Sequence, residues 1–294
     1  MRSIRIGSYR FKPRFFVIML VALLIVVLLI TGIVKLVKRD NGAGSTNSGP
    51  VVAISSGHDS AADPGAGPYG DVWEYQLNDA IAKALQKELE SRGYKVIQVR
   101  QLNSKDEKSQ QERAKIINDS WPDIFISLNQ NSNQDQSAAG FTLVYNDEKI
   151  DTYDGDYLRY QNGVYKIQSQ ADGVIHYMSG SKTKKLNTAK NEGKYEVFTL
   201  NKDEQITESI RLAESLYTQM SELAFISPFS DSKENTVLAQ NMQLLRLTHS
   251  VGIEVQCGYM SNEAELAELL KEENQTALCK AVADGIDRYF NAGE

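Results

Sequence analysis

The stretch Val51-Val52-Ala53-Ile54-Ser55-Ser56-Gly57-His58 decides the fold that the sequence predicts. A short apolar run ends in small polar residues and Gly57, a pattern that is typical of a buried β-strand followed by a turn. A loop rich in Gly, Pro and Asp comes next, and Glu74 stands where a helix is expected to begin. Because an imidazole after the strand and a carboxylate on the helix are both metal-ligand types, this stretch predicts half of a metal site.

Downstream of this stretch, the spacing of apolar residues switches between strand and helix periods. Helices are expected at Glu74–Glu90 and Glu107–Ser120, and strands at Tyr94–Arg100, Ile124–Leu128 and Phe141–Tyr145. This order predicts an α/β fold with a mixed, mostly parallel sheet flanked by helices. In such a sheet the functional site is expected beyond the carboxyl ends of the parallel strands.

The segment from Asp147 to about Gln205 interrupts this alternation. It is rich in Tyr, Gly, Asp and Lys, and strand-like pieces lie at Val164–Ile167, Gly173–Met178 and Tyr195–Leu200. We therefore expect an inserted β-rich region at about residues 147–205 and not a structureless loop. The α/β pattern then resumes, with further elements expected at Ile206–Leu223, Val251–Val255, Glu263–Leu270 and Gln275–Phe290.

The first 39 residues differ from the rest of the chain. Phe15–Val34 is a run of twenty uncharged residues, long enough to cross a bilayer as a helix. Five basic residues precede it and three follow it, which favours a cytoplasmic N-terminus and an uncleaved anchor over a signal peptide. The sequence thus predicts a single-pass protein of the cell membrane, with a basic tail and transmembrane anchor at 1–39, a flexible linker at 40–50 and an extracytoplasmic domain at 51–294.

Charge and cysteine content narrow the possible partners. Beyond residue 39 the chain holds 24 basic and 38 acidic residues, a net charge of −14. This balance argues against nucleic acid as a partner and against adhesion to anionic polymers. Cys257 and Cys279 do not define a disulfide framework, and although they could pair, the sequence favours two buried thiols.

Ordered blocks along the chain carry a family resemblance. They are Gly57-His58, Asp63-Pro64-Gly65-Ala66, Glu74 with Leu77 and Asn78, Glu112-Arg113, Asn118, Asp123–Leu128, Gly140–Tyr145, Leu244-Leu245-Arg246 and Gln256–Asn262. Together they resemble the zinc-dependent N-acetylmuramoyl-L-alanine amidases of the amidase-3 class. The resemblance implies an amidase-3-like fold with zinc as cofactor. It also implies hydrolysis of the amide that joins the muramic acid lactyl group to the stem peptide of peptidoglycan.

The resemblance also implies a role for each position of the family's site. His58 and Glu74 match the first and second zinc ligands. Asn129 stands at the third-ligand position, where the family has His, and Gln256 stands at the general-base position, where the family has Glu. A neutral amide is a poor zinc ligand and cannot accept a proton, so zinc binding and catalysis are both expected to be impaired.

Other residues offer replacements for the missing groups. Glu254 lies two residues before Gln256, on the same face of the expected strand, and is a candidate substitute base; alternatively it is a buried acid paired with Arg246 or faces solvent. Arg246 is itself a candidate catalytic residue through its block. His249 and His176 are the remaining imidazoles. Either could complete a metal site, and a surface position is the alternative for His249.

Three functions stay open. The first is a membrane-anchored, catalytically impaired amidase-like domain that binds peptidoglycan or its stem peptide. The second is an active, atypical amidase that uses Glu254 and a rebuilt zinc site. The third is a protein-interaction module that contacts a partner through the insert at 147–205. The joint presence of Asn129 and Gln256 favours the first, because it removes a metal ligand and the base together.

Overall fold

The structure is a computed structural model that describes residues 4–6, 9–11, 49–60, 62–103, 107–161 and 163–292. The chain divides into two units, Met1–Thr46 and Asn47–Glu294. The described part of the first unit is a pair of antiparallel strands, β1 (Ile4–Ile6) and β2 (Tyr9–Phe11). The predicted anchor and residues 40–48 of the predicted linker lie outside the described residues. Within the described residues, no helix combines the length and apolar character that crossing a membrane requires.

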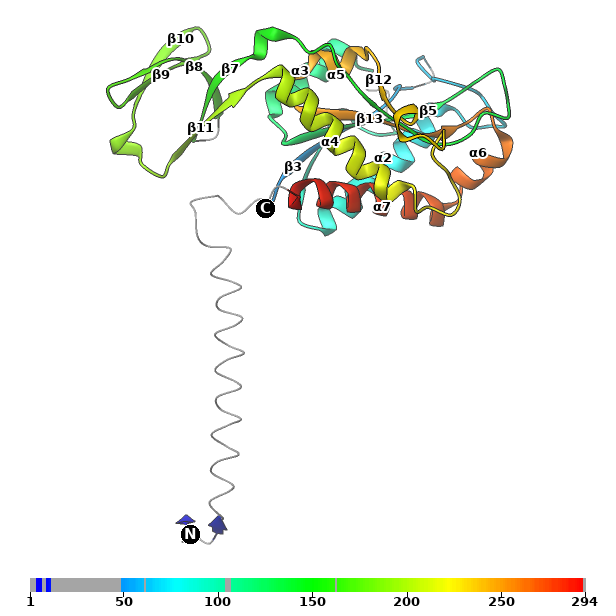
Figure 1. The fold of residues 1–294 in the computed structure, drawn as a ribbon, viewed down its shortest axis with the longest axis horizontal. Helices are drawn as coiled ribbons and strands as arrows, with labels where there is room; N and C mark the ends of the chain where they lie inside the picture. The colour runs from blue at the N-terminus through cyan, green and yellow to red at the C-terminus, as the bar shows by residue number, and fades with distance from the viewer. Residues whose placement is uncertain are drawn as a thin grey trace. The chain divides into compact units, whose positions relative to one another are not determined.

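A six-stranded sheet forms the centre of the second unit (Figure 1). In spatial order its strands are β12 (Val237–Ala239), β6 (Thr142–Tyr145), β13 (Val251–Tyr259), β5 (Ile124–Asn131), β3 (Val51–Ser56) and β4 (Lys95–Gln98). Neighbouring strands are parallel except for β6 and β13, which are antiparallel. The predicted mixed, mostly parallel sheet is therefore confirmed.

Helices cover both faces of this sheet. They are α2 (Glu74–Ser91), α3 (Gln110–Ser120), α4 (Lys202–Met220), α5 (Gln243–Leu247), α6 (Glu263–Leu269) and α7 (Glu272–Asn291). The predicted helices are present with shifted ends. For example, α3 begins at Gln110 and not at Glu107, because Ser109 caps it: the hydroxyl accepts from the backbone N–H of Glu112, whose carboxylate returns to Ser109. Sequence periodicity missed α5 and β12, which are too short to show a period.

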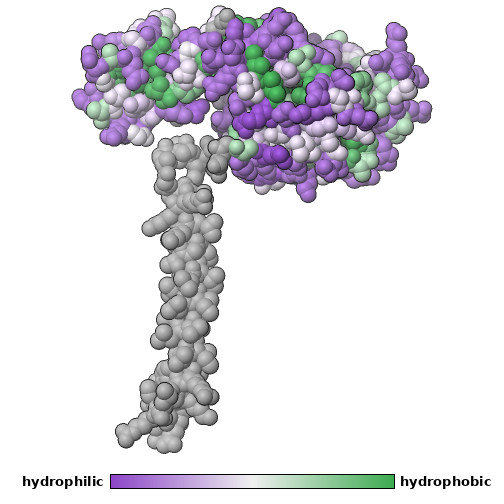
Figure 2. Space-filling view, viewed as in Figure 1, coloured by the Kyte–Doolittle hydropathy of each residue, from purple (hydrophilic) through white to green (hydrophobic). Residues whose placement is uncertain are grey.

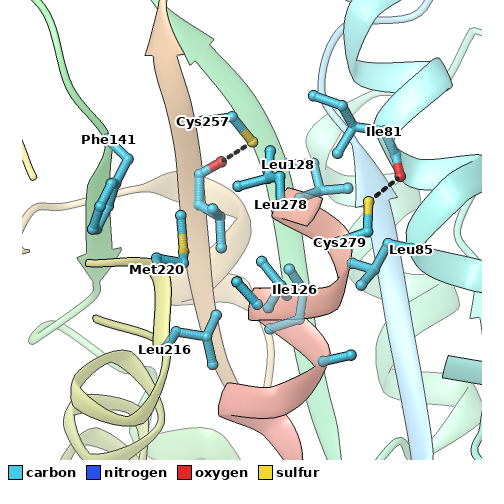
Figure 3. Close-up of a cluster of buried hydrophobic side chains, with 14 of the residues drawn as sticks. Ile81, Leu85, Ile126, Leu128, Phe141, Leu216, Met220, Cys257, Leu278 and Cys279 are labelled. Atoms are coloured by element: carbon cyan, nitrogen blue, oxygen red, sulfur yellow. Dashed lines mark hydrogen bonds between the residues drawn. The ribbon is translucent and has the colours of Figure 1, made fainter. Parts of the chain in front are cut away.

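The two faces of the sheet have separate cores because side chains alternate along a strand. Val52, Ile54, Ile124 and Ile126 pack with α2, α4 and α7, whereas Ala53 and Phe125 pack with α3 and α5. Figure 3 shows the first core, in which Cys257 and Cys279 are buried and unpaired. Their thiols donate to the carbonyls of Val255 and Ile81. The expectation of two buried thiols is confirmed.

The inserted region forms its own antiparallel sheet. In spatial order its strands are β10 (Lys182–Asn187), β9 (Val174–Ser179), β8 (Gly163–Ala171), β7 (Gly155–Tyr160) and β11 (Tyr195–Leu200). Leu158, Ile175, Tyr177 and Leu186 make a small core of their own. Strands β7 and β10 were not predicted, and the four polar or basic residues that precede Leu186 in β10 explain why its strand signal is weak.

The insert projects from the end of the six-stranded sheet at which the parallel strands begin. Strand β6 leads into the insert, and because β6 runs antiparallel to β13, its last residues lie beside the first half of β13. The carboxyl ends of β3, β5 and β13 lie at the opposite end. The insert and the expected functional site are therefore separated by the length of the sheet.

Candidate functional site

A polar pocket of about 390 Å³ opens at the carboxyl ends of β3, β5 and β13. Its lining includes most of the predicted site residues, namely His58, Glu74, Asn129, Glu254 and Gln256. They come from the β3–α2 loop, the start of α2, the end of β5 and the middle of β13. The fold thus brings together residues that are up to about two hundred positions apart, at the end of the sheet where a site was expected.

His58 and Glu74 form an ion pair on one side of the pocket. The imidazole Nε2 lies 3.3 Å from a Glu74 oxygen, and Nδ1 lies 2.8 Å from Asp63. The bond to Glu74 raises the pKa of His58 to about 9, against the opposing effect of burial. Burial also works against the charge of Glu74, but His58 and the backbone N–H groups of Ala66 and Gln130 hold its pKa below the ordinary value.

The backbone at His58 adopts an unusual conformation. Its φ is +57°, in the left-handed region that residues other than glycine seldom occupy. The preceding Gly57 lies so close to β5 that a Cβ added there would overlap the side chain of Asn129. Glycine is therefore required at position 57, where the β3 turn packs directly against Asn129 at the third-ligand position.

On the other side of the pocket, Asn129 and Gln256 belong to a chain of hydrogen bonds around Glu254. Asn129 Nδ2 donates to Ser127 Oγ (3.3 Å), which donates to Glu254 (3.4 Å). Gln256 Nε2 donates to the other Glu254 oxygen (3.1 Å), and its own oxygen accepts from the hydroxyl of Thr142. Both polar atoms of the Gln256 amide are thus engaged by protein groups.

Glu254 is buried at the centre of this chain. Its pKa is raised to about 7, mainly by burial; the negative charge of Glu74 adds to the rise, and the hydrogen bonds that Glu254 accepts oppose it. The side-chain donors that reach it within the described residues include Ser127 and Gln256 but not Arg246. Arg246 is half-buried on α5 and does not line the pocket. The expectation that Glu254 pairs with Arg246 is therefore wrong.

The two other histidines lie away from the pocket. His249 is buried just before β13, at the far end of the sheet, where it stacks on Trp121 at 3.9 Å between ring centroids and its Nε2 donates to the carbonyl of Asn118. Burial lowers its pKa to about 4. Both predictions for His249, a pocket position and a surface position, are wrong. His176 lies on β9 of the insert.

The pocket does not fit the zinc ion that the resemblance implies. Zinc in hydrolytic sites is held by three imidazole, thiolate or carboxylate ligands. At the three ligand positions of the family, the donors here are one imidazole, one carboxylate and one amide, from His58, Glu74 and Asn129. Among the described residues, no three His, Cys, Asp or Glu side chains are grouped to hold a metal ion. A metal site completed by His249 or His176 is not supported, because neither histidine lines the pocket.

Sequence reasoning missed a buried ion pair at the pocket, between Asp59 and the pocket-lining Arg113. The Arg113 guanidinium on α3 donates to Ser55 Oγ and to the carbonyls of Ser56 and His58, and forms an ion pair with Asp59. Burial lowers the pKa of Arg113 to about 10. Arg113 therefore ties α3 to the turn that carries His58. The Glu112-Arg113 block was recognised in the sequence, but the block alone does not predict that Arg113 pairs with Asp59.

Comparisons with known proteins identify the family and the fold of the chain. The sequence profile of the N-acetylmuramoyl-L-alanine amidase family matches residues 52–288. The fold is similar to that of an N-acetylmuramoyl-L-alanine amidase from Clostridium difficile 630, with 17% identity, a TM-score of 0.57, and coverage of 85% of this chain and 100% of that chain. It is also similar to the catalytic domain of CwlV from Bacillus (Paenibacillus) polymyxa var. colistinus, with 18% identity, a TM-score of 0.55, and coverage of 83% and 99%.

A third similar structure is the CwlD amidase from Clostridioides difficile, which was solved in complex with the GerS lipoprotein. It shares 17% identity at a TM-score of 0.55, and the match covers 83% of this chain and 100% of that chain. No curated protein matches the chain. At these identities the structural likeness establishes the fold, and the profile match over most of the chain establishes the family.

Proposed function

The chain belongs to the N-acetylmuramoyl-L-alanine amidase family, and we propose that it binds the stem-peptide region of peptidoglycan without cleaving it. The observation that carries this proposal is the arrangement of the two amides that replace the family's third ligand and base. Asn129 and Gln256 line the pocket, and both take part in the hydrogen-bond chain around Glu254.

Amide hydrolysis by a zinc enzyme depends on a metal that acidifies a bound water and polarises the carbonyl, and on a base that takes the proton from that water. The donor set of this pocket does not fit the metal, and an amide at residue 256 cannot take the proton. What remains suits recognition. Gln110, Gln243 and the His58–Glu74 pair line the same pocket and offer donors and acceptors for the amide and carboxylate groups of a peptide.

One observation favours the second candidate, an active and atypical amidase. Glu254 lies in the pocket, and its pKa of about 7 is close to the value that suits a general base near neutral pH. However, its two oxygens already accept hydrogen bonds from Ser127 and Gln256. We therefore assign Glu254 to the structure of the pocket and keep its catalytic role as the alternative.

We propose further that the domain lies outside the cell membrane, held by a single transmembrane segment at Phe15–Val34. The uncharged run and the excess of basic residues before it support this placement. The insert at 147–205 is a candidate surface for a protein partner, and the similar CwlD was solved together with the GerS lipoprotein. Peptidoglycan outside the membrane is the partner that the family membership supports.

The test combines metal analysis, binding and hydrolysis on the full-length protein in detergent. After dialysis against zinc, we expect less than stoichiometric metal, measurable binding of a muropeptide by calorimetry, and no release of stem peptide. The double variant Asn129→His/Gln256→Glu restores the missing ligand and base, so we expect it to gain zinc and hydrolytic activity. Asn129→His alone is the matched control, expected to gain zinc with little activity.

Two results would overturn the proposal. Stoichiometric zinc in the natural protein, together with release of stem peptide that Glu254→Gln abolishes, would establish the atypical enzyme. Failure to bind any muropeptide would remove peptidoglycan as the ligand of the pocket, whatever the metal content.

A further inference from the structure

Five lysines lie on the edge strand β10 of the inserted sheet and on the connection from β10 to β11, the strand at the other edge. Lys182, Lys184 and Lys185 lie on its edge strand β10, and Lys190 and Lys194 lie in the connection from β10 to β11. We call the five residues the lysine face; they lie on both sides of the inserted sheet, because side chains alternate along β10 and Lys184 and Lys185 point to opposite sides. All five are exposed, and none forms an ion pair with an acid elsewhere in the described chain. In Figure 2 hydrophilic residues form the outer margin of the insert, at the left of the view.

The lysine face contrasts with the charge of the rest of the domain. Residues 155–200 hold seven basic and four acidic residues, a net charge of +3, whereas the remainder of 51–294 holds 17 basic and 33 acidic residues, a net charge of −16. Lysines on an edge strand discourage pairing with a foreign strand, which accounts for those on β10. Lys190 and Lys194 lie outside the strand, so edge protection does not account for them.

The lysine face belongs to the end of the molecule at which the chain enters the domain. Val51, the first residue of β3, donates its N–H to Asp123 beside the start of β5 (2.7 Å). The base of the insert is fixed at this same end, because Asn118 Nδ2 donates to Tyr153 Oη (2.9 Å) and Trp121 packs on Tyr157. The start of β3, at which the described part of the domain begins, and the insert therefore lie at one end of the sheet, and the pocket lies at the other.

We propose that the lysine face binds the anionic headgroups of the membrane, so that the pocket points away from the bilayer and toward the wall. This inference rests on the membrane anchor of the proposed function. A linker of the length of residues 40–50 spans at most about 35 to 40 Å, which by itself would let the domain present either end to the lipid. Attraction of the lysine face and repulsion of the acidic remainder select one orientation within a Debye length of the surface.

The test uses the full-length protein in nanodiscs of phosphatidylglycerol or of phosphatidylcholine, with lysine acylation rates read by mass spectrometry. We expect the lysine face to react several-fold more slowly in the anionic discs than in the zwitterionic discs. Lys83, Lys233 and Lys271, on the body of the domain, serve as internal references with equal rates in both. High salt should remove the difference, because it screens the attraction.

A variant separates the lysine face from a general effect of charge. In Lys182→Gln/Lys184→Gln/Lys185→Gln, the remaining protection of Lys190 and Lys194 should fall, whereas Lys83→Gln/Lys233→Gln/Lys271→Gln, with the same change in charge, should retain it. Equal acylation rates in both lipids would overturn the inference, as would protection by purified cell wall and not by lipid. If the protein is not retained in the discs at all, the anchor fails, which is a different result from retention without protection.

Discussion

Two histidines, one at each end of the six-stranded sheet, differ in charge at neutral pH: the imidazole of His58 is protonated and that of His249 is neutral. At the pocket end, His58 lies between Asp63 and Glu74, and its pKa is raised to about 9. At the insert end, His249 is buried against Trp121, and its pKa is lowered to about 4. The charged groups at the pocket end suit a polar ligand. At the insert end the neutral His249 packs on Trp121, which also packs on Tyr157 of the insert and so connects the two sheets. Partners, and not residue type, decide the role of each imidazole.

The largest effect is expected from removing the guanidinium that holds the charged end together. Arg113→Leu leaves Asp59 buried with one partner fewer and frees the turn of His58, and breaking a buried ion pair costs about 3 to 5 kcal/mol. Urea denaturation should show a free energy of unfolding lower by about that amount. The control is Lys115→Leu on the same helix, whose pair with Asp119 is exposed and contributes below about 1 kcal/mol. Equal losses for the two variants would contradict the structural role of Arg113.

The second prediction concerns how the stability of the protein depends on pH through the neutral His249. His249 binds a proton near pH 6.5 in the unfolded chain but only near pH 4 in the folded protein. Its contribution to the free energy of unfolding is therefore complete above pH 6.5 and is lost as the pH falls toward 4. The shift corresponds to about 3 kcal/mol, since each pKa unit is worth about 1.4 kcal/mol. We expect this part of the acid sensitivity to vanish in His249→Phe, which keeps a ring against Trp121. The free energy of unfolding, measured against pH for both proteins, decides it: parallel curves would refute the buried, neutral imidazole.

These two ends also differ in how much the sequence could predict. At the pocket end, the apolar runs predicted strands β3 and β5, and the resemblance to the amidase-3 class placed His58, Glu74, Asn129 and Gln256 in one site. Such signals are local, because a strand and the residue that follows it can be recognised within a few positions. The carboxyl-end rule for parallel strands then joins segments that are far apart in the chain.

No comparable rule predicts the contacts at the insert end from the sequence. The contact of His249 with Trp121 joins the loop before β13 to the loop before β5, and no periodicity links two loops. Trp121 also has a left-handed backbone, φ +49°, as the residue that caps the carboxyl end of α3 before Pro122. The partner of Glu254 was misjudged for the same reason. Arg246 was the nearest arginine in sequence, yet the amide of Gln256, two residues away on the same strand face, makes the bond.

The smallest effect is expected from the loss of the proton of His58 at alkaline pH. Because the folded pKa of His58 is about 9 and the unfolded value 6.5, its contribution is complete below pH 6.5 and is lost as the pH rises through 9. The side chain is about one-third exposed, so solvent screening reduces the effect to about 1 to 2 kcal/mol. In His58→Asn, which tolerates a left-handed backbone, unfolding free energies between pH 6.5 and 9 should lose this slope. The acid response of His249 should persist in that variant, since the two imidazoles lie at opposite ends of the sheet; loss of both responses together would mean that the ends are not independent.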